Sequence, residues 1–149
     1  MAEITRANLI LADYAQAADG KLTLVGGGFN TMLVPDVPSQ LPPFFAALSL
    51  TVKPSPVLHL ITGGPAGQAF EVEMGVNDTT LGKLEVRLRP QQGPNAQEVL
   101  NLAVPLNGLT AEQPGLLSIW FAVGGERIAT ADLFVRVRSQ VPVNGISPN

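Results

Sequence analysis

The amino-acid sequence predicts an all-β protein, an antiparallel β-sandwich of eight or nine short strands. Glycine and proline, 15 and 13 of the 149 residues, punctuate the chain about every ten residues and leave little room for helices. The stretches between them are rich in β-branched and aromatic residues. In the clearest stretches apolar and polar residues alternate, which is the period of a strand with one buried face.

The expected strands follow one another along the chain with turn signals between them. Eight ranges are 8–13, 21–26, 44–52, 70–76, 84–89, 99–106, 116–123 and 126–137, and the run 29–34 and the short run 57–61 are further candidates. A proline-rich loop, Pro35–Pro43, separates the run 29–34 from the strand 44–52. The only helical candidate surrounds Thr110–Gln113 and is one turn at most.

Charge and apolar patterns predict the register of a first hairpin. Apolar residues occupy the even positions from Phe70 to Val76 and from Leu84 to Leu88, with charges between them. If paired residue numbers sum to 160, all apolar side chains share one face, Glu73 lies opposite Arg87, and Glu71 lies opposite Arg89. A longer loop, 77–82, then joins the two strands.

A second hairpin is expected around Gly124-Gly125, because two glycines tolerate the positive φ angles of a two-residue turn. This turn pairs Phe121 with Ile128. Further along the second strand the apolar residues change from even to odd positions, which predicts a bulge near Ala129–Asp132.

The glycine cluster Gly26–Gly28 raises the question of a phosphate-binding loop. Such a loop needs a helix after the glycines, but the next residues are aromatic, β-branched and end in proline. The cluster therefore predicts a bend, where the chain passes from one sheet to the other.

Composition excludes several classes of function. The chain has no cysteine, so disulfides and thiolate metal sites are excluded. A net charge of −3 argues against a nucleic-acid partner. The first residues lack a signal peptide and no apolar run is long enough for a membrane helix, so synthesis in the cytoplasm and no membrane partner are expected. Charged residues are only 14% of the chain, which indicates either covered sheet faces or surface buried against other chains.

No catalytic constellation is present in the sequence, so we expect no enzyme, no cofactor and no metal site. His59 is the only histidine and lies in an apolar strand. Glu71 and Glu73 share one strand face, which does not flank a substrate as paired catalytic carboxylates do. An enzyme would remain conceivable only if Asp13, Tyr14 and His59 converged in one pocket.

Interaction residues are expected at three places. Trp120 is a contact anchor if its ring points outward. Arg136 and Arg138 form a short basic ladder suited to an acidic partner. Pro142 and Pro148 lie in a flexible tail, 139–149, which with Pro35–Pro43 is expected to reach neighbouring chains; residues 1–138 are expected to form a single domain.

Two stretches, "ANLILADYAQAADGKLTLVGGGFN" and "PGLLSIWFAVGGERIATADLFVRV", resemble a family of small uncharacterised proteins of actinobacteria and their phages. The resemblance runs from about Ala7 to Val137. It implies an all-β sandwich and no reaction. The closing hairpin is also similar to edge hairpins of immunoglobulin-like modules, which makes an immunoglobulin-like or related sandwich the expected architecture.

These patterns predict a non-enzymatic module that acts through protein–protein contacts. Two settings fit: an accessory or decoration subunit of a phage particle, assembled into the virion, or a homo-oligomer. The alternative is a sandwich that binds a carbohydrate or a small molecule between loops at one end. Exposed aromatic side chains clustered in a loop groove would favour that alternative.

Overall fold

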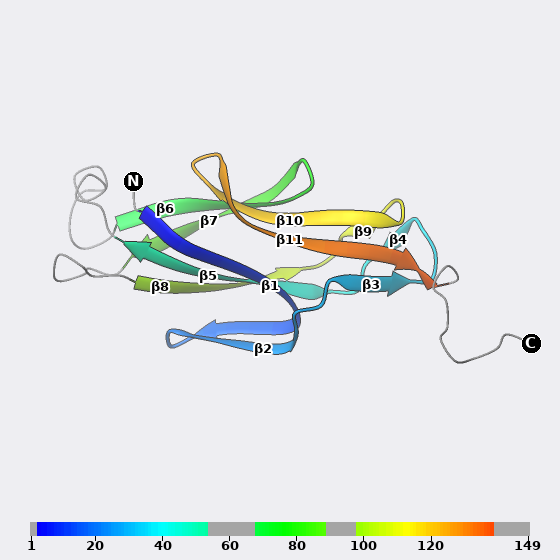
Figure 1. Ribbon diagram of the computed structural model, residues 1–149, viewed down its shortest axis with the longest axis horizontal. Coiled ribbons are helices and arrows are strands. Elements are labelled where there is room, and N and C mark those ends of the chain that lie inside the picture. The colour runs from blue at the N-terminus through cyan, green and yellow to red at the C-terminus, as the bar shows by residue number, and fades with distance from the viewer. Residues whose placement is uncertain (1–2, 54–67, 89–97, 139–149) are drawn as a thin grey trace, which may run out of the picture.

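A computed structural model describes residues 3–53, 68–88 and 98–138 of the chain. Two β-sheets pack face to face around one apolar core, and the described residues contain no α-helix (Figure 1). The predicted all-β fold is confirmed. Eleven strands are present in the described residues, two of them only two residues long.

The sheets have four and five strands. The four-stranded sheet has the order β2 (Lys21–Gly27), β1 (Glu3–Ala18), β5 (Phe44–Lys53), β8 (Glu98–Leu106). The five-stranded sheet has the order β3 (Thr31–Val34), β11 (Glu126–Val137), β10 (Gly115–Val123), β6 (Gln68–Val76), β7 (Thr79–Leu88). Neighbouring strands are antiparallel except β3 and β11, which are parallel, so the expectation of a wholly antiparallel sandwich is corrected at this edge.

The glycine cluster is the place where the chain changes sheets. Gly26 and Gly28 have φ angles of 62° and 86°, a region that residues with a side chain rarely adopt. A Cβ on Gly26 would overlap the carboxylate of Asp13, so this position is closed to other residues for a second reason. The Gly28 N–H donates a 2.8 Å hydrogen bond to the Leu11 carbonyl, which fixes the crossing. The predicted bend is therefore confirmed, and β3 enters the second sheet running parallel to β11.

The core follows the alternation of the strands. In β5 the even positions, Phe44 to Val52, point between the sheets and are buried. The facing sheet contributes its own inward rows, and the largest fully buried side chains of the two sheets are Phe44, Phe121, Leu11, Leu48, Leu50, Ile119 and Leu133.

The β1–β2 hairpin covers the outer face of the four-stranded sheet. The first half of β1 pairs with β5, whereas the second half pairs only with β2. The Tyr14 ring packs edge-on against Phe45, with 5.3 Å between centroids, and Asn101 of β8 donates to the Gly20 carbonyl at the hairpin turn. Ala47 belongs to the outward row of β5 but is only 1% exposed, because this hairpin lies over it.

The predicted register of the first hairpin is wrong. The paired residues of β6 and β7 sum to 156 or 155, so Glu73 lies opposite Lys83 and Glu71 lies opposite Glu85. The loop is shorter than expected, because Asn77 adopts a φ of 51° and closes a two-residue turn. The predicted and observed registers differ by an even number of residues along most of the hairpin. The apolar side chains were therefore assigned to the correct face of the sheet.

The second hairpin confirms the Gly124-Gly125 turn and the change of phase. Val123 pairs with Glu126, and the register shifts by one residue at Ile128, which becomes the extra residue of a bulge. The bulge thus lies just before the predicted stretch 129–132, and Phe121 pairs with Ala129 rather than with Ile128.

The helical candidate at 110–113 is a further correction. Residues Thr110–Ala111 form β9, which pairs with β4 (Ser39–Gln40) inside the proline-rich loop. Leu41 donates its N–H to the Leu109 carbonyl at 2.7 Å and is 3% exposed, so this loop is anchored to its own chain. The strand expected at 57–61 and the tail 139–149 lie outside the described residues, and the single domain 1–138 stays a prediction.

Candidate functional site

Three exposed apolar side chains adjoin on the outer face of the five-stranded sheet. Leu116 of β10 and Phe134 of β11 are direct partners, and paired residues project from the same face of a sheet. Leu33 of β3 is the partner of Arg136, two positions along from Phe134 on that face. Leu33, Leu116 and Phe134 are 43%, 48% and 42% exposed. We call these three residues the Phe134 face.

The sequence places Phe134 on this face by alternation. Leu133, Val135 and Val137 are buried in the core, so the residue between the first two must point outward. The change of the apolar residues to odd positions in this strand was visible in the sequence, but the outward direction of Phe134 was not predicted from it. Leu33 gave no comparable signal, because its place beside Phe134 depends on a parallel strand pairing that the sequence did not indicate.

The predicted basic ladder borders the Phe134 face. Arg136 is exposed and lies between Phe134 and the end of β11, and Arg138 is exposed directly after that strand. An apolar centre with an arginine rim is a composition typical of protein interfaces. Pro142 and Pro148, the other predicted interaction residues, lie outside the described residues.

Trp120 lies on the outer face of the five-stranded sheet, in the same row as Leu116 and Ser118, but it is only 5% exposed because Arg127 and the β6–β7 turn cover its ring. Its role as a contact anchor stays a prediction. Its ring lies against Gly75, its partner in β6, and beneath Arg127, whose Cζ is 4.7 Å from the ring centroid. Trp120 Nε1 and Arg127 Nη2 both donate to the Asn77 carbonyl, at 2.7 and 2.9 Å. Trp120 therefore fastens the β6–β7 turn to β10 and β11.

Asn77 completes this attachment through its own side chain. Ser118 donates its backbone N–H to Asn77 Oδ1 at 2.9 Å, and the Asn77 N–H donates to the Ser118 carbonyl at 2.8 Å. The Ser118 hydroxyl in turn donates to Asp132 of β11 at 3.0 Å. A single turn residue thus holds three strands of the sheet together.

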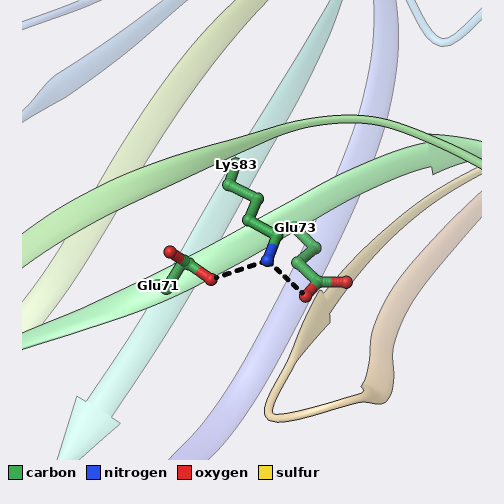
Figure 2. A network of polar contacts seen from close by, with 3 residues as sticks. All are labelled: Glu71, Glu73 and Lys83. Atoms are coloured by element: carbon green, nitrogen blue, oxygen red, sulfur yellow. Dashed lines mark ion pairs between the residues drawn. The ribbon is translucent and has the colours of Figure 1, made fainter.

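A charged cluster occupies the outer face of β6 and β7. Lys83 Nζ lies 3.4 Å from Glu71 Oε1 and 3.6 Å from Glu73 Oε1, between the two carboxylates (Figure 2). The carboxylate of Glu71, followed by that of Glu73, raises the pKa of Lys83. On the same strand Arg87 Nε donates to Glu85 Oε1 at 2.9 Å. These pairs are exposed, so they shape the surface charge more than they stabilise the fold.

The residues of the conceivable enzyme site are not brought together in the described part of the chain. Asp13 packs against Gly26, whereas Tyr14 contacts Phe45 and donates weakly to Gln16 at 3.5 Å. His59 lies outside the described residues. No group of three or more metal-ligating side chains occurs among residues that the structure describes.

Three open depressions, of about 330 to 440 Å³, mark the described surface. One lies between β1 and the β10–β11 turn, one beside the Asp19-Gly20 turn, and one beside Pro114. None of the three is lined by an aromatic side chain. The clustered aromatic groove that would favour a carbohydrate or small-molecule ligand is thus not found in them.

No helix in the described parts of the chain is long and apolar enough to cross a membrane.

Comparisons with known proteins show the family. Residues 8–136 match a family described as a family of unknown function (DUF6941). A search of curated proteins gave no match. The CARDB domain of the Pyrococcus furiosus protein PF1109, solved in complex with di-metal ions, is 16% identical with a TM-score of 0.44, covering 91% of this chain and 94% of that one.

A second solved structure resembles the chain more weakly. The Pseudomonas fluorescens alkylpurine DNA glycosylase AlkC, bound to DNA containing an abasic site analog, is 15% identical with a TM-score of 0.39. The match covers 91% of this chain but 30% of that protein.

Proposed function

Because the chain belongs to DUF6941, a family of unknown function, we propose its function from its own surface: a non-enzymatic module that binds another protein through the Phe134 face. The observation that carries the proposal is the adjacency of Leu33, Leu116 and Phe134. Single exposed apolar residues are ordinary, but a contiguous group on one sheet face is typical of a contact surface.

The contrast between the two sheets supports the same proposal. The outer face of the four-stranded sheet is covered by the β1–β2 hairpin, which reduces Ala47 to 1% exposure. No described residue covers the Phe134 face in this way. A rigid sheet that holds three apolar side chains side by side also loses little conformational entropy on binding.

The partner is a protein with an apolar patch and acidic groups at its rim, because Arg136 and Arg138 flank the Phe134 face. A subunit that decorates a phage particle, from an actinobacterial phage as the sequence resemblance implies, is one setting that uses such a surface. Assembly of several copies of the chain is the other.

The test is quantitative capture from a lysate of the source organism, with and without infecting phage. The bait is the full chain, compared with the double variant Leu116→Ser, Phe134→Ser. Val99→Ser is the matched control, because Val99 is 56% exposed on the other sheet. We expect specific proteins that the wild type and the control retain and the double variant loses at least tenfold. Equal capture by the double variant and the control would contradict the proposal.

A further inference from the structure

Strand β7 is an open edge of the five-stranded sheet. Among the described residues it pairs only with β6, so one side of its backbone has unpaired N–H and C=O groups. Two of its leucines, Leu81 and Leu84, are 43% and 37% exposed. The strand runs from Thr79 to Leu88 with a bulge at Leu81, and no other described segment pairs with its free side.

The charges beside this edge are unbalanced within one copy of the chain. Glu71 and Glu85 lie directly opposite each other, and like charges in this position destabilise a strand pair. Lys83 is paired with Glu71 and Glu73, and among the described residues only Arg87, from the same strand, forms an ion pair with Glu85. Within this part of the chain, three carboxylates thus share two cations. A cation on the free side of Glu85 would offset the excess negative charge.

We propose that β7 pairs with β7 of a second copy, antiparallel and about a two-fold axis at Leu84. The partner's Lys83 then lies opposite Glu85, and the partner's Glu85 lies opposite Lys83. Leu84 packs against its own copy, and the two five-stranded sheets become one continuous sheet. The occupant is a second copy of this chain because the edge is complementary to itself in charge.

The register follows from backbone geometry. Successive residues of a strand direct their hydrogen-bonding groups to opposite edges, so two identical edges related by a two-fold axis must be centred on a residue and not between two. A centre on Lys83 or on Glu85 places like charges on the axis. Leu81 is the extra residue of a bulge in β7 and interrupts this alternation, so a centre on Leu84 gives a regular overlap of 82–86 and a centre on Val86 gives one of 84–88. We choose the centre on Leu84 because it sets Lys83 opposite Glu85, and the mixing experiment below tests that choice.

This interface is distinct from the Phe134 face, which lies over β3, β10 and β11 at the other side of the sheet. Pairing through β7 does not cover the Phe134 face, so a dimer formed in this way presents two such faces. The self-association inferred here and the partner binding proposed above can therefore fail separately.

The first test is light scattering coupled to size exclusion over a dilution series of the full chain. We expect a dimer that dissociates to monomer on dilution. Glu85→Lys relieves the contact with Glu71 within one copy but places two lysines opposite each other across the axis. We expect it to remain folded and to raise the dimer dissociation constant at least tenfold. Glu112→Lys, the same charge change on an exposed residue away from β7, is the matched control.

A mixing experiment tests the proposed register of the two β7 strands. Lys83→Glu alone is expected to be monomeric, as is Glu85→Lys alone, but an equimolar mixture restores both opposite-charge pairs and is expected to form a heterodimer. A wild type that is monomeric at every concentration overturns the proposal. So does a Glu85→Lys variant that dimerises like the wild type, or a dimer lost through Leu116→Ser, Phe134→Ser and not through Glu85→Lys.

Discussion

Replacing Gly75 with alanine is expected to destabilise the protein through Trp120. A Cβ at this position would overlap the indole ring at Cζ2 and Cε2 and would also meet the Thr79 carbonyl oxygen. The ring cannot simply move aside, because its Nε1 donates to Asn77 and Arg127 lies over its other face. The substitution therefore forces either strain in the strand or loss of the Trp120 contacts.

The magnitude follows from three contributions. Overpacking of a filled site costs about 1–3 kcal/mol. Loss of the Nε1 hydrogen bond costs roughly 0.5–1.5 kcal/mol. Alanine in a strand recovers about 0.5–1 kcal/mol of backbone entropy relative to glycine. The net expectation is about 2 kcal/mol of destabilisation, or roughly 4–8 °C in melting temperature for a chain of this size.

The assay is urea unfolding followed by the fluorescence of Trp120, the only tryptophan of the chain. Gly82→Ala in the adjacent strand is the matched control, because a Cβ there meets nothing within 4 Å. We expect the control to be as stable as the wild type or slightly more stable. The account of Trp120 is refuted if Gly75→Ala unfolds at the same urea concentration as Gly82→Ala with an unchanged emission maximum.

Three further predictions concern single side chains. Trp120→Phe keeps the apolar ring and loses the hydrogen bond to Asn77, so we expect a loss of about 1 kcal/mol by urea unfolding monitored with circular dichroism. Gly26→Ala is expected to cost about 1–2 kcal/mol from its positive φ, with a further loss from the clash with Asp13 that Asp13→Ala relieves in the double variant. The pKa of Lys83 is raised above its ordinary value of 10.5, so its ion pairs contribute stability below that pH. This contribution is lost as the pH rises through the pKa of Lys83 in the folded state. We therefore expect the urea midpoints of the wild type and Lys83→Gln to converge at high pH or in 1 M salt.

The sequence predicted best where the pattern is local. Alternation identified the inward rows of β6 and of the far part of β11, and two adjacent glycines located the turn after Val123. The bulge was visible as a change of phase, although Ile128 lies one residue before the predicted stretch. Such features depend on a few neighbouring residues whose backbone preferences are strong.

The register of the first hairpin and the pairing of strands distant in the sequence were harder to predict from the sequence. The predicted register, with Glu73 opposite Arg87, maximised the number of opposite-charge pairs but required a longer loop than the two-residue turn at Asn77. The hairpin instead places Glu71 opposite Glu85. Asparagine tolerates a positive φ, so the tight turn was available from the sequence, and the attraction of opposite charges was given too much weight against it. Nothing local could show that β3 lies parallel to β11, because that pairing depends on how two sheets are stacked.

The two sheets differ in how their outer faces are covered. Over the four-stranded sheet the β1–β2 hairpin supplies the cover, so small apolar residues such as Ala12 and Ala47 lie outside the main core without meeting water. Over the five-stranded sheet no described segment supplies an equivalent cover at Leu116 and Phe134. Internal packing therefore explains the scarcity of charge over the four-stranded sheet. The five-stranded sheet carries an exposed charged cluster on β6 and β7, and the protein contact that we propose concerns only its Phe134 face.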